Sequence, residues 1–163
     1  MIRPILTYPD ERLATPCDAV GTVSANVQIL AADLLETMYG AEGRGLAAPQ
    51  VGEMQRIFVM DAGWKDGNRA PMVMVDPEIV AHSDETATSD ETCLSIPDVT
   101  ASVERPAEIT LAYTNLSGER REEVLTGDAA RIAQHEIDHL DGKLTFDRVS
   151  TEERSRLESA YDG

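Results

Sequence analysis

The most informative segment of this chain is the run His135-Glu136-Ile137-Asp138-His139. Two imidazoles four residues apart lie on the same side of an α-helix, so both side chains can reach one metal ion. Glu136 follows the first histidine, which places a carboxylate beside any water that the metal holds. The alternative is a buried helix whose histidines only pack or cap. Because the motif is matched in full, we expect a metal site on a helix.

The residues around this motif also favour a helix. Gly127-Asp128 is a typical start signal, and Gly142 is a typical stop signal. Apolar residues recur between them at helical spacing, namely Ala129, Ile132, Ala133 and Leu140. The motif is therefore expected near the centre of a helix with one apolar side.

The rest of the chain mixes helical and β-like segments. An amphipathic helix is expected over 24–38, with Ser24 as its N-cap and with Gly40 ending it. A glycine-bearing loop is expected over 43–50. Strand-like segments are 57–60, 72–75, 79–80, 99–104, 108–114 and 121–125, and a short polar helix closes the chain at about 151–160. Strands and helices do not alternate regularly, which predicts an α+β fold with antiparallel β-sheets packed around a central helix that carries the His-Glu-x-x-His motif.

Length and composition limit the class of protein. The 163 residues suit a single domain over 1–163, and 42% hydrophobic with 27% charged residues is ordinary for a globular protein. No apolar stretch is long enough to cross a bilayer, and residues 1–5 lack the apolar core of a secretory signal, so we expect a cytoplasmic location and no membrane partner. The net charge of -16 repels phosphates, which argues against direct nucleic-acid binding.

A catalytic metal site usually needs three protein ligands and leaves a position for water, so a third ligand must lie elsewhere. One protease pattern places a third histidine six residues after the second, but Thr145 stands there. Glu158 is a second candidate, on a polar segment with little core to hold it rigid. Cys93 is favoured over both, because a thiolate is a strong ligand for zinc or ferrous iron and its segment is flanked by apolar residues.

Two other residues could bind metal but have simpler interpretations. Cys17 lies in a polar stretch near the N-terminus and is expected to be structural. His82 is expected to be an exposed loop histidine, with a ligand role as the weaker alternative. Two cysteines in a chain of this length favour free thiols or a metal ligand over a disulfide scaffold.

Three ordered motifs together resemble those of the peptide deformylases. That family carries a Gly-x-Gly-Leu-Ala-Ala-x-Gln loop, a Glu-Gly-Cys-Leu-Ser segment and a Gln-His-Glu-x-Asp-His helix. This chain has Gly-Arg-Gly-Leu-Ala-Ala-Pro-Gln at 43–50, Glu-Thr-Cys-Leu-Ser at 91–95 and Gln-His-Glu-Ile-Asp-His at 134–139. The similarity extends over nearly the whole chain, from 5–6 through 146–148.

The resemblance implies a hydrolase that removes the formyl group from N-formylmethionyl peptides or nascent chains. It also implies one divalent metal ion, Fe²⁺ in the first place, with Zn²⁺, Ni²⁺ or Co²⁺ as other occupants. By position, Cys93, His135 and His139 are the implied metal ligands. The implied catalytic residues are Glu136 as general base and acid, with Gln50 and the backbone N–H of Leu94 holding the formyl oxygen.

Four residues are expected to bind the substrate. Gly43 and Gly45 would let an extended peptide approach the backbone and add to it as a strand, although both also fit plain turns. Ile132, three residues before the first histidine, is a candidate wall of the methionine pocket, with core packing as an equal alternative. Arg44 stands next to the substrate side-chain pocket, where the family commonly has an aliphatic residue.

Two departures bear on substrate preference more than on metal binding. Thr92 replaces the usual glycine, and a β-branched side chain there could restrict the backbone or narrow the cleft. Arg44 suits an apolar methionine poorly, unless its stem packs and its head reaches solvent. A further hypothesis is that Glu91 and Arg105 form a structural pair across two strands.

Two other functions stay open on the sequence. A zinc endopeptidase would cleave unblocked peptides internally, and the missing downstream ligand argues against it. A deformylase-like protein with weak or altered N-acyl specificity would bind blocked N-termini without efficient turnover, and Thr92 and Arg44 motivate that reading. Because family members act on nascent chains, a transient ribosome contact is also implied, although the acidic composition supplies no RNA-binding feature.

Overall fold

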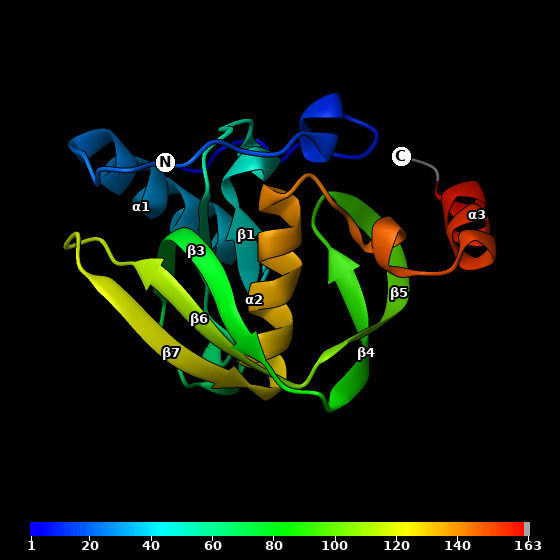
Figure 1. The fold of residues 1–163 in the computed structure, drawn as a ribbon. Helices are drawn as coiled ribbons and strands as arrows, with labels where there is room; N and C mark the ends of the chain where they lie inside the picture. The colour runs from blue at the N-terminus through cyan, green and yellow to red at the C-terminus, as the bar shows by residue number, and fades with distance from the viewer. Residues whose placement is uncertain (162–163) are drawn as a thin grey trace.

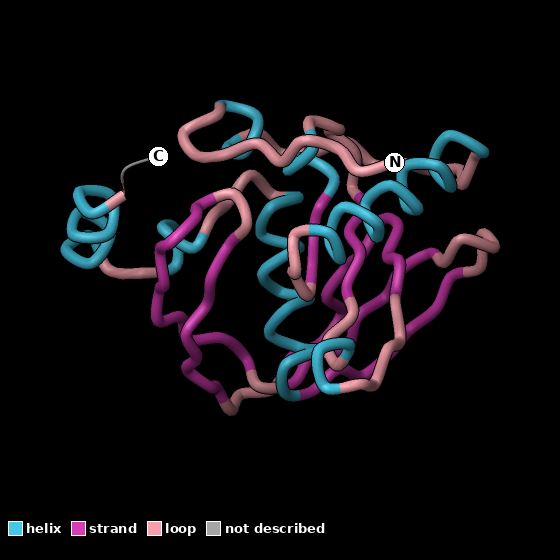
Figure 2. The backbone as a smooth tube through the Cα atoms, turned by 180° about the vertical axis from the view of Figure 1, so that it is seen from behind, coloured by secondary structure: helices cyan, strands magenta, loops and turns pink. Residues whose placement is uncertain are grey.

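The computed structural model describes residues 1–161, which form two antiparallel β-sheets and three α-helices (Figures 1 and 2). The larger sheet has the strand order β1-β2-β3-β6-β7, and β4 and β5 form a separate hairpin. Its strands are β1 (Gly45–Ala47), β2 (Ile57–Met60), β3 (Met72–His82), β6 (Glu108–Thr114) and β7 (Arg120–Thr126). The hairpin consists of β4 (Thr86–Cys93) and β5 (Ile96–Pro106), and the helices are α1 (Ala25–Gly40), α2 (Gly127–Leu140) and α3 (Thr151–Ala160).

Helix α2 runs between the large sheet and the β4–β5 hairpin, as Figures 1 and 2 both show. Its apolar side packs against buried residues of the large sheet that include Phe58, Met74 and Leu111. The predicted α+β architecture around a central helix is therefore confirmed. The motif consequently lies in the interior, between two sheets.

Helix α1 covers the start of the large sheet. Its N-cap is Ser24, as predicted, and the Ser24 hydroxyl accepts a hydrogen bond from the backbone N–H of Val27. The apolar stripe packs against β1 and β2, where Leu46 and Ile57 are fully buried. This packing fixes the position of β1 and of the 3-10 turn Ala48–Val51 that follows it.

The two strand-like segments predicted on either side of Pro77 are both strands, and the structure joins them. Segments 72–75 and 79–80 belong to one strand, β3, which passes through Pro77 with a shift of register between Val75 and Glu78. Asp76 takes a positive φ of 48° at this irregularity, and its carboxylate accepts hydrogen bonds from the backbone N–H groups of Val20 and Gly21. A β-bulge lets proline stay within a strand because the ladder is already interrupted there.

Strands β1 and β4 were missed from the sequence. The glycine segment 43–50 was expected to be a loop, but it contains β1 and a 3-10 turn over Ala48–Val51. β4 is mostly exposed and buries only Glu91 and Cys93, so it lacks the apolar alternation that marks a strand. Both strands are defined by their partners rather than by their own composition.

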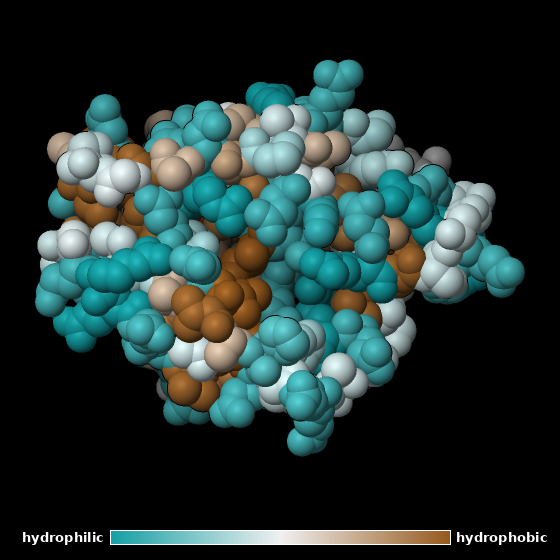
Figure 3. Space-filling model, viewed as in Figure 1, coloured by the Kyte–Doolittle hydropathy of each residue, from teal (hydrophilic) through white to brown (hydrophobic). Residues whose placement is uncertain are grey.

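The surface reflects the acidic composition. Figure 3 shows a largely hydrophilic face, with hydrophobic residues gathered over β3 and β6. Among the described residues, no helix has the length and apolar character that a bilayer crossing requires.

Candidate metal centre and active-site pocket

Three potential metal ligands converge beside α2. The structure brings Cys93 from the end of β4 together with His135 and His139 of α2, and one ligand atom from each lies within 4.8 Å of the others. The Sγ atom of Cys93 lies 3.4 Å from His139 Nε2, which lies 3.3 Å from His135 Nε2. All three residues are buried. One thiolate and two imidazoles suit Zn²⁺ or Fe²⁺, so this donor set fits a divalent cation.

A hydrogen bond on one ring nitrogen of His135 decides which nitrogen can bind a metal ion. His135 Nδ1 lies 2.9 Å from the carboxylate of Glu91, which accepts its hydrogen bond. A neutral imidazole that donates through Nδ1 keeps Nε2 free to bind metal. Burial lowers the pKa of His139 well below its usual range, with His135 and Arg105 adding to the effect. His139 is therefore held neutral, as a metal ligand requires.

Glu91 belongs to a buried network of charges. Arg105 donates two hydrogen bonds to Glu91, at 2.7 and 2.9 Å, so the pair predicted from the sequence is present. Burial alone would raise the pKa of Glu91, but hydrogen bonds from Arg105 and His135 outweigh it and hold the pKa at about 2. The carboxylate stays charged and fixes the orientation of His135.

Asp138 and Arg148 complete the network and were not assigned a role from the sequence. Asp138 accepts hydrogen bonds from Arg105 at 2.9 Å and from Arg148 at 2.6 and 2.9 Å. The available signal was the position of Asp138, three residues after His135 and therefore on the same side of the helix. When that side of the helix is buried, the charged Asp138 carboxylate needs a cationic partner, because burying an unpaired charge is costly.

Glu136 lies beside the ligand cluster and lines the same pocket. It is 4% exposed, its Oε1 atom has no hydrogen-bond partner within residues 1–161, and burial raises its pKa to about 7. A Cβ atom at Gly45 would lie 2.5 Å from Glu136 Oε2, so only glycine allows β1 to approach this carboxylate so closely. A carboxyl with this pKa can both accept and return a proton near neutral pH.

Gln50 and Leu94 line the pocket near Cys93. The Gln50 amide oxygen accepts a hydrogen bond from the backbone N–H of Ala47 at 2.9 Å. Its amide nitrogen donates to Ser95 Oγ at 3.0 Å and lies 3.8 Å from Cys93 Sγ. The Gln50 side chain is therefore fixed at both ends, and Ser95, which we did not single out from the sequence, is one of its anchors.

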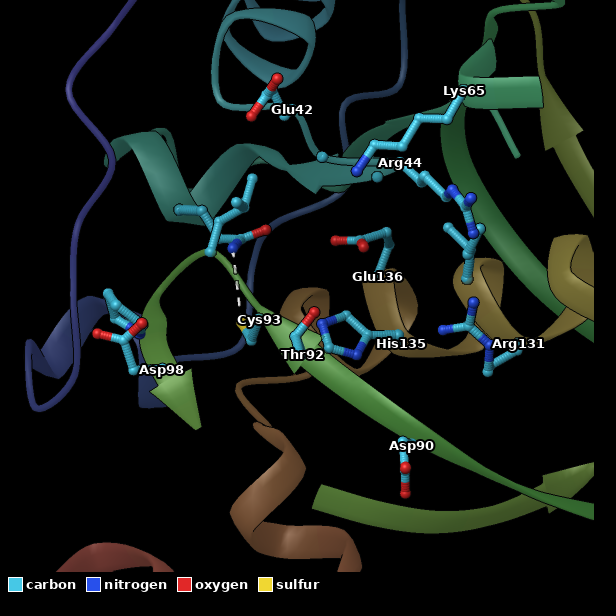
Figure 4. A pocket seen from close by; sticks show the side chains of 16 residues that line it. Glu42, Arg44, Lys65, Asp90, Thr92, Cys93, Asp98, Arg131, His135 and Glu136 are labelled. Carbon is cyan, nitrogen blue, oxygen red and sulfur yellow. Dashed lines mark hydrogen bonds between the residues drawn. The ribbon is translucent and has the colours of Figure 1, made fainter. Parts of the chain in front are cut away.

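The pocket has a volume of about 680 Å³ and opens beside these residues (Figure 4). The four predicted substrate-binding residues, Gly43, Arg44, Gly45 and Ile132, all line it. Thr92 lines it as well. Ile132 is 4% exposed and also packs in the main core, so both of its predicted roles are compatible with its position. Arg131 and Lys65 add two cations to the lining that the sequence analysis did not consider.

The remaining candidates lie elsewhere. Cys17 is a free, buried thiol whose backbone N–H donates to Leu140, and burial raises its pKa to about 11. His82 is exposed, as expected, but it ends β3 rather than lying in a loop. Glu158 pairs with Arg154 on α3. None of the three belongs to the metal-ligand cluster found in the described residues.

A buried cysteine, two buried histidines and an adjacent carboxyl at the wall of an open pocket define a metal-dependent hydrolase. A family model described as polypeptide deformylase matches residues 2–155. The chain belongs to the peptide deformylase family, whose metal-dependent enzymes remove the formyl group from N-formylmethionyl peptides.

Relatives and solved structures agree with this membership. The chain is 44% identical over 156 residues to a peptide deformylase of Afipia carboxidovorans, covering 96% of this chain and 91% of that protein. It is 42% identical to one of Rhizobium meliloti, at 96% and 90% coverage. A crystal structure of a peptide deformylase from Legionella pneumophila has a TM-score of 0.91 at 37% identity, covering 98% of this chain and 92% of that one.

Proposed function

We propose that this chain carries out deformylation with one divalent cation held by Cys93, His135 and His139, and with Glu136 as the general base and acid. The supporting observation is the convergence of the three buried ligand atoms within 4.8 Å, at the wall of the pocket that Glu136 lines. When bound, the cation supplies Lewis acidity and lowers the pKa of water at the site.

In this proposal Glu136 moves the proton. Its carboxylate accepts a proton from the attacking water, and the resulting acid returns it to the departing amine as formate is released. The pKa of about 7, raised by burial, suits both halves of this transfer. The unpartnered Oε1 atom is available for the water, because no protein group within residues 1–161 competes for it.

Gln50 and Leu94 are proposed to bind the formyl oxygen, on which negative charge develops. The Gln50 amide is held by Ala47 and Ser95, so it needs little rearrangement to donate there. The peptide backbone is proposed to add to the free edge of β1, which pairs only with β2 among the described strands. Gly43 and Gly45 make room for that approach.

Ferrous iron is the proposed native metal, and Zn²⁺, Ni²⁺ and Co²⁺ are compatible with the same donors. We further propose that residues 1–163 act as one catalytic domain in the cytoplasm on nascent chains, with at most a transient ribosome contact. Elemental analysis of anaerobically purified protein identifies the metal. Co-sedimentation with ribosomes at physiological salt tests the contact.

The test of function is formate release from formyl-Met-Ala-Ser by metal-loaded protein, with acetyl-Met-Ala-Ser and an unblocked peptide as controls. Formate from the first peptide only is the expected result. Internal cleavage of the unblocked peptide would instead indicate an endopeptidase. Cys93→Ala should lose both bound metal and formate release. Retention of stoichiometric metal in that variant would contradict the proposed ligand set.

A further inference from the structure

Two arginines line the pocket beside a close contact between β1 and α2. A Cβ atom at Gly45 would lie 2.8 Å from Ile132 Cγ2. Arg44 directly precedes Gly45, and Arg131 directly precedes Ile132. Both arginines line the pocket. In Figure 4 both lie on the same side of Glu136 and His135, away from Cys93 and Asp98.

Arg44 has no internal counter-charge within residues 1–161. Its Nε atom is buried and has no hydrogen-bond partner there, and it forms no ion pair with a described residue. A side chain whose head simply reached into solvent would keep its Nε–H hydrated. An orphaned donor on a charged group costs stability unless something else binds it. The side chain therefore lacks an acceptor that a ligand could supply.

Arg131 is only weakly neutralised. Its side chain is 23% exposed, and its nearest acidic partner is Asp128, whose Oδ1 atom lies 3.5 Å away and whose side chain is 65% exposed. Asp90 also lines the pocket but is exposed. Lys65 adds a third cation to the lining. The acidic residues Glu42 and Asp98 also line the pocket, but in Figure 4 they lie on the side away from the two arginines. Arg44 and Arg131 therefore form a local cationic cluster in a protein whose net charge is -16.

We propose that Arg44 and Arg131 form a cationic subsite that binds a carboxylate of the formylated substrate. This inference rests on the proposed function and specifies its substrate class: formyl peptides with an acidic side chain near the N-terminus. The planar guanidinium presents several N–H donors in a fork that matches a carboxylate, and such charge-assisted hydrogen bonds are stronger than neutral ones. The buried Nε–H of Arg44 gains its missing acceptor in the complex.

The carboxylate can come from the first residue of the peptide or from the second. Two matched pairs distinguish these sources: formyl-Glu-Ala-Ser against formyl-Gln-Ala-Ser, and formyl-Met-Glu-Ser against formyl-Met-Gln-Ser. The measured quantity is the acid-to-amide ratio of kcat/KM within each pair, at low and at high salt. Any general effect of a substitution on turnover cancels in this ratio.

The wild-type protein should prefer the acid by about tenfold in one pair, and salt should reduce the preference. The double variant Arg44→Gln with Arg131→Gln should bring that ratio to about one. Arg120→Gln, which removes an exposed cation outside the pocket, is the matched control and should leave the ratio unchanged. Binding of the same peptides to metal-free protein gives a second readout, through the fluorescence of Trp64, which donates a hydrogen bond to the Gly43 carbonyl.

Ratios near one in both pairs, with formate released, would overturn the subsite and leave the proposed function intact. An acid preference that survives the double variant would also overturn it, because the charge would then act from elsewhere. Absence of formate from all four peptides with metal-loaded protein would overturn the proposed function and this inference with it.

Discussion

The two sides of α2 are both buried, but by different means. Toward the large sheet the helix presents alanine, isoleucine and leucine side chains, which include Ala133, Ile137 and Leu140 and pack into an apolar core. Toward the β4–β5 hairpin it presents His135 and Asp138, which meet Glu91 and Arg105 through charged hydrogen bonds. One side is stabilised by removing apolar surface from water, and the other depends on each buried charge having a partner.

The two sides of α2 should therefore respond differently to substitution. The apolar side can accept a similar hydrophobic residue at modest cost. The polar side cannot lose one member without leaving another charge buried and unpaired. In return, that side fixes the ring of His135 through its hydrogen bond to Glu91, which an apolar contact does not do. The following four changes test this contrast.

The largest effect is expected for Glu136→Gln. The substitution keeps the size of the side chain but removes the group that accepts the proton, so kcat for formate release should fall by about 10²–10⁴-fold. Metal content should stay at the wild-type level, because Glu136 is not a proposed ligand. Full turnover in this variant would exclude the proposed role.

Arg105→Met should be the most destabilising change on the polar side. It leaves Glu91 without its bidentate partner and Asp138 with Arg148 alone, and should lower the free energy of unfolding by about 3–5 kcal/mol. Urea denaturation of metal-free protein measures this. Arg154→Met, which breaks ion pairs of a partly exposed arginine on α3, is the control and should cost about 1 kcal/mol or less. Equal costs for the two variants would remove the contrast between buried and exposed pairs.

Glu91→Gln should act on the metal through His135. An amide oxygen can still accept from Nδ1 but supplies no negative charge, so metal affinity should fall by about 10–100-fold. Competition with a chelator measures the affinity. An unchanged affinity would mean that the carboxylate has only a structural role.

The smallest effect is expected on the apolar side. Ile137→Val removes one methylene from a side chain that is 7% exposed and should cost about 0.5–1.5 kcal/mol of stability. Metal affinity, measured by the same chelator competition, should not change. A loss of affinity here would show that the two sides of the helix are coupled.

The local elements and the identity of the reactive groups could be predicted from the amino-acid sequence. Helical spacing of apolar residues located α2, and the interval between His135 and His139 placed both imidazoles on one side of it. Ser24 marked the start of α1. These features depend on residues close in the chain, so periodicity and capping chemistry are enough to read them.

The family resemblance already indicated Cys93 as a ligand, but the contacts that bring distant groups together are visible only in the folded chain. Cys93 lies 46 residues before His139, yet packing of the hairpin against α2 brings its sulfur 3.4 Å from that ring. The same packing buries Asp138 between Arg105 and Arg148, and the approach of β1 to α2 places Arg44 and Arg131 in the lining of one pocket. Such contacts depend on how whole elements pack. A buried charge needs a partner, but that partner can lie anywhere in the sequence, and the pair produces no periodic pattern from which it could be predicted.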